Sequence, residues 1–181
     1  EQTQHLITRL RNGNLDLAIM ALPSEATGMV DSPLYTEKFS IVCPPDHPIA
    51  GREDVELAEL KDLDLLLLDD GHCLRDQVVD LCRHANINPA EATNSVTRAS
   101  SLTTIMQLVM GGLGCTLVPE SALATECHGK DVAVAHFAPD VTAEREVGLV
   151  FRSSAARAEE FREFGTLITA AYNKAIERSR Q

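Results

Sequence analysis

The 181-residue sequence contains no tryptophan, and aromatic residues make up only 4% of it. So few rings argue against a surface on which nucleobases stack. Basic residues are also scarce, because 16 Lys and Arg face 27 Asp and Glu, which leaves a net charge of −11. Phosphate contacts are made by Lys and Arg, so this chain is not expected to bind DNA or RNA by itself.

Long hydrophobic runs are absent as well. The densest, Leu63 to Leu68, is interrupted by Asp64 and falls short of the roughly 18 apolar residues that cross a membrane. The N-terminus is polar and does not resemble a signal peptide. Hydrophobic residues nevertheless make up 44% of the chain, as in globular proteins. Five cysteines are an odd number in a chain long enough to bury a core, which favours a cytoplasmic protein with free thiols over a disulfide scaffold.

Apolar periodicity and turn residues predict the order of helices and strands. Helices are expected at residues 3–12, 55–61, 74–84, 101–110 and 155–176. Strands are expected at residues 15–21, 33–36, 39–43, 64–68, 94–98, 115–118, 132–137 and 145–151, with a loop at 85–93. This alternation predicts an α/β fold with mixed, mostly parallel sheets and helices on both faces.

Two segments are candidate crossings between lobes: the proline-rich stretch 44–48 and the polar stretch 138–144. Residues 1–35 and 145–181 would then form lobe I, and residues 36–144 would form lobe II. This is the plan of a two-lobed binding module.

One segment places a thiol among charged groups at the expected start of a helix. It runs Asp69-Asp70-Gly71-His72-Cys73-Leu74-Arg75-Asp76-Gln77, and Cys82-Arg83-His84 follows. The positive end of the helix dipole, together with His72 and Arg75, favours the reactive thiolate of Cys73. The three aspartates oppose this effect.

The spacing of Cys73 and Cys82 is itself informative. Nine residues of helix rise about 13.5 Å and place the two side chains on opposite faces. A disulfide needs Cα atoms within about 7 Å, so this pair bonds only if the helix unfolds or refolds. Such coupling of oxidation to a change of fold is typical of a redox switch.

Three other interpretations stay open on spacing alone. In the first, His72, Cys73, Cys82 and His84 bind zinc, although no close C-x₂₋₄-C pair is present. In the second, Cys73 is a phosphatase-type nucleophile, although Val79 stands where that loop needs arginine. In the third, both cysteines are inert buried thiols.

The identity of the residues around the two cysteines, and not only their spacing, is informative. The run from Leu68 to Gln77, followed by Cys82, resembles the signature around the redox cysteines of the peroxide-sensing LysR-type transcriptional regulators. Three further segments resemble parts of the same family: Ser100-Ser101-Leu102-Thr103-Thr104, a hydroxyl-rich helix start; Gly112 to Pro119, a glycine-rich strand; and Arg145 to Arg152, a late strand. The resemblance covers essentially the whole chain.

The resemblance implies a periplasmic-binding-protein-like, LysR-type regulatory domain that is not an enzyme. It implies that hydrogen peroxide oxidises Cys73 and that Cys82 then forms a disulfide with it. The fold and the oligomer interface would change, which controls the transcription of oxidative-stress genes.

The same resemblance implies a peroxide pocket formed by Thr3, His72 and Arg145. Their ordinary structural roles would be a helix N-cap, a turn histidine and a strand-end salt bridge. The other cysteines match no redox position and are expected to be structural: Cys43, Cys115 and Cys127.

The implied partners are hydrogen peroxide, further copies of the chain in a dimer or tetramer, and RNA polymerase. DNA would be bound only through an N-terminal winged helix-turn-helix domain, which this sequence lacks, as it lacks the expected first strand of lobe I. No cofactor, metal or membrane partner is expected. One alternative is a LysR-type domain that binds a small metabolite between the lobes through Ser100 and Ser101, and another is a thiol peroxidase.

Overall fold

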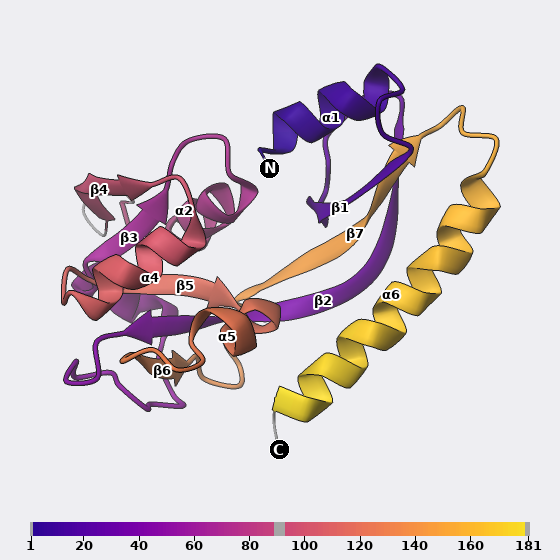
Figure 1. Ribbon diagram of the computed structural model, residues 1–181. Coiled ribbons are helices and arrows are strands. Elements are labelled where there is room, and N and C mark those ends of the chain that lie inside the picture. The colour runs from indigo at the N-terminus through magenta and orange to yellow at the C-terminus, as the bar shows by residue number, and fades with distance from the viewer. Residues whose placement is uncertain (1, 89–92, 180–181) are drawn as a thin grey trace. The chain divides into compact units, whose positions relative to one another are not determined.

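The computed structural model describes residues 2–88 and 93–179 (Figure 1). These residues form two compact units, one of Glu1–Glu37 with Arg145–Gln181 and one of Lys38–Glu144. The chain leaves the first unit within strand β2 (Met29–Cys43) and returns within β7 (Glu144–Arg152), and not through the proline-rich stretch 44–48. The lobe boundaries at 35/36 and 144/145 stay predictions.

The first unit is a sheet covered by a helix on each face. Helix α1 (Thr3–Arg11) packs on β1 (Leu17–Leu22) and β7, and α6 (Ala158–Ser179) packs on the opposite side. Successive side chains of a strand point to opposite faces. Val150 of β7 therefore packs in the cluster that contains α1 residues, whereas Phe151 meets Phe161 of α6, with ring centroids 5.4 Å apart.

The second unit is organised around β3 (Leu65–Leu68), four leucines that are all buried. Leu65 and Leu67 join one hydrophobic cluster with α2 (Cys73–His84), and Leu66 and Leu68 join another with α4 (Leu102–Met110). A strand covered on both faces has no polar side to its sequence, which explains the uninterrupted leucines.

The remaining described elements of this unit surround β3. They are the 3₁₀ helix η1 (Leu57–Asp62), β4 (Thr93–Ala99), β5 (Thr116–Pro119), α5 (Glu120–Glu126) and β6 (Ala133–His136). Together the two units confirm an α/β fold with helices on both faces.

The expectation of mostly parallel sheets is wrong, because three of the four strand pairs whose register is described are antiparallel. β1 pairs antiparallel with β7, and β2 pairs antiparallel with both β5 and β6. The β3–β4 pair is parallel, as strands on either side of a helical connection are expected to be. The long strands that carry the chain out to the second unit and back add antiparallel edges that the helix–strand alternation does not reveal.

Most expected elements are present, with three differences. The strands expected at 33–36 and 39–43 are one continuous strand, β2. Helix α5 follows Pro119 directly and was not expected. The loop expected at 85–93 lies partly outside the described residues, at 89–92. No helix in the described ranges is both long enough and apolar enough to span a membrane.

The turn before β5 depends on a glycine. Gly114 has a φ of +148°, and a Cβ there would collide with the backbone oxygen of Asp64, next to β3. Gly112 has a φ of +74°, but open space surrounds its missing Cβ.

We expect Gly114→Ala to lower the free energy of unfolding by more than about 3 kcal/mol, because backbone strain adds to a clash that displaces β5 from β3. Gly112→Ala is the matched control and should cost only about 1–2 kcal/mol, from strain alone. Urea denaturation of both variants measures the difference. Equal losses would show that the turn can move away from Asp64.

Candidate functional site

The predicted reactive segment lies at the carboxyl edge of the parallel pair β3–β4. Leu68 and Ala99 are the last paired residues, and the Asp69 amide donates to the Ala99 carbonyl oxygen over 3.0 Å. After this edge each strand leads into a helix, β3 into α2 and β4 into α4. Two helices therefore begin at one edge of the sheet, the usual place for ligands in α/β proteins.

Cys73 is the first residue of α2, as the sequence predicted. His72 is the N-cap residue, and its carbonyl oxygen accepts hydrogen bonds from the amides of Arg75 (3.0 Å) and Asp76 (3.4 Å). The His72 side chain makes no capping hydrogen bond. The Cys73 side chain lies in the first turn of α2 and is only partly buried.

A salt bridge spans the turn that carries Cys73. The Arg75 Nε lies 2.7 Å from the Asp70 Oδ1, and the arginine side chain is 17% exposed against 71% for the aspartate. The positive charge of Arg75, which was expected to stabilise the Cys73 thiolate, is thus paired with the Asp70 carboxylate. The bridge connects the residues before and after His72 and Cys73, and so holds the start of α2 in place.

Cys82 has a different environment on the same helix. Its side chain is fully buried in the cluster that contains Leu65 and Leu67, and burial raises the pKa of its thiol. Cys73 and Cys82 therefore face different surroundings, as expected for residues nine positions apart. No disulfide is present, and both thiols are free.

The carbonyl oxygen of Cys82 also takes part in ending the helix. It accepts a 2.9 Å hydrogen bond from the Ile87 amide, and the Asn86 amide donates to the Arg83 carbonyl oxygen, also at 2.9 Å. Asn86 has a φ of 57°, the left-handed conformation of a Schellman closure. Moving Cys82 out of the helix breaks this closure.

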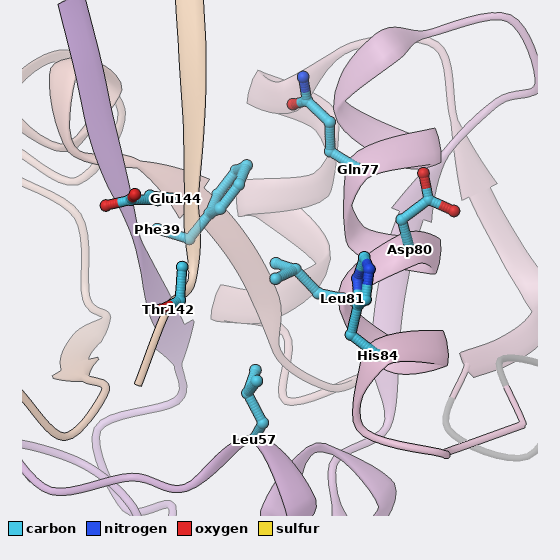
Figure 2. A pocket seen from close by; sticks show the side chains of 8 residues that line it. All are labelled: Phe39, Leu57, Gln77, Asp80, Leu81, His84, Thr142 and Glu144. Atoms are coloured by element: carbon cyan, nitrogen blue, oxygen red, sulfur yellow. The ribbon is translucent and has the colours of Figure 1, made fainter. Parts of the chain in front are cut away.

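One face of α2 borders a pocket of about 430 Å³ in the second unit. Figure 2 shows Leu81 of α2 pointing toward Phe39 of β2, with Leu57 also directed into the space. Polar residues complete the lining: Gln77, Asp80, His84, Thr142 and Glu144. This face of α2 is therefore partly open, although Leu81 and Cys82 in the same half of the helix are buried in the core.

The other two predicted pocket residues belong to the first unit. Thr3 is the first residue of α1, and its N-cap is Gln2, so the alternative role of Thr3 as N-cap is wrong. Arg145 forms the expected salt bridge: its Nη2 and Nε lie 2.7 and 2.8 Å from the Glu37 Oε1. Their joint role with His72 in a peroxide pocket stays a prediction.

Two alternatives can be compared with this geometry. Ser101 is the N-cap of α4, and its Oγ accepts a hydrogen bond from the Thr104 amide over 3.2 Å, while Ser100 is exposed beside it. This hydroxyl already has a structural partner. The predicted zinc ligands are spread along α2, and no three or more His, Cys, Asp or Glu side chains in the described ranges come together as metal ligands.

The sequence comparison identifies the family. The LysR substrate binding domain matches residues 1–173, and the chain belongs to this family. A protein of Mycobacterium avium named as a probable hydrogen peroxide-inducible genes activator is 48% identical over 168 residues, which are 93% of this chain and 53% of that protein. The chain thus spans about half the length of this relative.

Solved structures give the same result. A cysteine mutant of Corynebacterium glutamicum OxyR with H2O2 bound has a TM-score of 0.94 and 58% identity, covering 98% of this chain and 55% of that one. The oxidised form of the same OxyR has a TM-score of 0.86 and 58% identity, covering 99% and 55%. The resemblance to peroxide-sensing LysR-type regulators, and the fold that it implied, are confirmed.

We expect the cysteines to react with iodoacetamide in order of accessibility. Partly buried Cys73 and Cys127 should react first, and fully buried Cys43, Cys82 and Cys115 at least roughly tenfold more slowly, because a closed core opens rarely. Burial also raises their pKa values, that of Cys115 to about 12, which leaves little thiolate at pH 8. Peptide mass spectrometry over time measures the order. Early labelling of Cys82 would show that α2 opens readily in the reduced protein.

We expect Arg145→Met to lower the free energy of unfolding by about 3–5 kcal/mol, because the Glu37 carboxylate, which has 0% side-chain exposure, loses its ion-pair partner. The matched control is Arg157→Met, since Arg157 pairs with Glu160 at the surface and its loss should change little. Thermal and urea denaturation compare the variants. A small effect at Arg145 would mean that Glu37 takes up a proton or another partner.

Proposed function

We propose that this chain is the redox-sensing regulatory domain of a transcriptional regulator that responds to hydrogen peroxide through Cys73 and Cys82. The observation that carries the proposal is the contrast along α2: a partly buried thiol at the helix start and a fully buried one nine residues later. The peroxide-related names of the relatives support the choice of oxidant.

The first step takes place at Cys73. Its thiolate attacks one oxygen of hydrogen peroxide, the O–O bond breaks, and Cys73 becomes a sulfenic acid while hydroxide leaves and is protonated to water. The Cys82 sulfur then attacks the Cys73 sulfur and displaces the sulfenic hydroxyl as a second water. Two thiols have lost two electrons, and peroxide has accepted them.

The second step, formation of the Cys73–Cys82 disulfide, requires a change of structure. Nine residues of helix separate the Cα atoms by about 13.5 Å, whereas a disulfide needs about 7 Å or less. Residues 74–81 must therefore leave the helical conformation, which withdraws Val78, Leu81 and Cys82 from the core. Each such apolar side chain contributes about 1.5–3 kcal/mol of burial, so the disulfide form repacks the second unit around α2.

This repacking is how we propose that oxidation reaches the rest of the regulator. A changed surface beside α2 alters the contacts between copies in a dimer or tetramer and so reorients the DNA-binding parts of the whole protein, with RNA polymerase as the further partner. The cytoplasm suits this role, because its thiols stay reduced until an oxidant arrives.

We expect stoichiometric hydrogen peroxide to produce a Cys73–Cys82 disulfide as the main oxidised species, measured by non-reducing peptide mapping with mass spectrometry. Cys82→Ser should stop at the Cys73 sulfenic acid, which dimedone traps, and Cys73→Ser should abolish the reaction at this pair. Cys127→Ser is the control, because this partly buried thiol lies after α5 and outside α2. A different main disulfide would overturn the mechanism.

The same variants separate the alternative functions. A metabolite-responsive LysR-type domain would keep its transcriptional response in the full-length Cys73→Ser protein, and would lose it on substitution of Ser100 and Ser101. A thiol peroxidase would turn over many equivalents of peroxide per chain when supplied with a reductant, whereas a sensor consumes about one.

A further inference from the structure

Two cysteines outside α2 lie at the ends of neighbouring strands: Cys43 is the last residue of β2, and Cys115 directly precedes β5. The antiparallel register of β2 and β5 pairs Phe39 with Pro119 and ends with Val42 opposite Thr116. Extending it by one residue places Cys43 opposite Cys115. Directly opposed residues point to the same face of a sheet, and both thiols join the same hydrophobic cluster.

The backbone hydrogen bonds define the type of this pair. The Cys115 amide donates to the Asp64 carbonyl oxygen over 2.9 Å, and the Cys115 carbonyl oxygen accepts from the Leu66 amide over 2.8 Å. Both groups of Cys115 are therefore turned toward β3 and away from β2. A pair of this non-hydrogen-bonded type has Cα atoms about 4.5 Å apart, within the 4.4–6.8 Å range of disulfides.

Burial keeps the pair reduced while the core is closed. Both side chains are 0% exposed, and burial, the neighbouring Cys43 and Asp64 raise the pKa of Cys115 to about 12. The Cys43 thiol donates a weak hydrogen bond to the Ala133 carbonyl oxygen over 3.7 Å. A neutral thiol out of contact with solvent reacts slowly with peroxide.

Helix α2 covers the same cluster. Val78, Leu81 and Cys82 pack in it together with Cys43 and Cys115, whereas the residues of α4, such as Ile105, pack in the cluster on the other face of β3. Loss of α2 packing would therefore open the face that holds the two thiols.

We propose that Cys43 and Cys115 are a second disulfide site of this domain, a buried cross-strand dithiol that peroxide oxidises when α2 leaves the core. One thiol is oxidised to a sulfenic acid with release of one water. The other then attacks that sulfur and displaces a second water, so two thiols and one H2O2 give one disulfide and two waters. Its gating by α2 extends the proposed function, but the site itself does not depend on the Cys73–Cys82 switch.

The test uses a chain that retains only this pair, Cys73→Ala with Cys82→Ala and Cys127→Ala, so failure of the proposed switch has no influence on it. Under prolonged excess hydrogen peroxide, transient opening of α2 should allow an intramolecular Cys43–Cys115 disulfide to form, which non-reducing peptide mapping detects. Adding Cys43→Ala should leave Cys115 without a disulfide. Circular dichroism first checks that each variant is folded. Prolonged exposure that yields only sulfinic or sulfonic acids, or no disulfide even after Leu81→Ala is added to open the α2 face, would overturn the site.

A second comparison tests the gating by α2. Adding Leu81→Ala opens the α2 face and should speed disulfide formation about tenfold, whereas Ile105→Ala opens the opposite face and should leave the rate within about twofold. Equal acceleration by both would overturn the gating by α2, because it would show that the dithiol is reached by general unfolding.

Discussion

The second unit depends on the burial of β3 on both faces. Its odd and even leucines face different clusters, so α2 is held on one side and α4 on the other. The parallel pairing with β4 then brings the starts of both helices to one edge of the sheet. A partly buried thiol at the start of α2 is thereby placed at the edge of the sheet where both helices begin.

Helix α2 combines firm and weak features. Its first turn is held by the Arg75–Asp70 bridge and its end by the closure at Asn86, while one flank faces an open pocket. Helices of this length owe most of their stability to tertiary packing. Withdrawing a few core side chains is therefore enough to destabilise the helix as a unit, which suits an element with two alternative conformations.

Much of this arrangement could be predicted from residue patterns. Four consecutive leucines indicated a buried strand, and the spacing of Cys73 and Cys82 indicated a helix that separates them. The antiparallel edges could not be predicted, because strand direction depends on where the long strands β2 and β7 lead and not on their composition. That Glu37 is the partner of Arg145, and that Cys43 lies near Cys115, could not be predicted either, since each pair joins residues more than 70 positions apart in the sequence. The role of Ser101 as N-cap, by contrast, follows from local chemistry, because serine is a preferred residue at a helix start.

The closure at the end of α2 has a consequence for how this sequence can vary. Cys82 supplies a carbonyl to that closure, fills a site without solvent exposure, and carries the second thiol of the proposed pair. A serine in its place removes the sulfur but also buries a hydroxyl, so it shifts the stability of the helix together with its chemistry. The stability of α2 and the reactivity of its second thiol are therefore coupled at this one position, so a substitution there changes both.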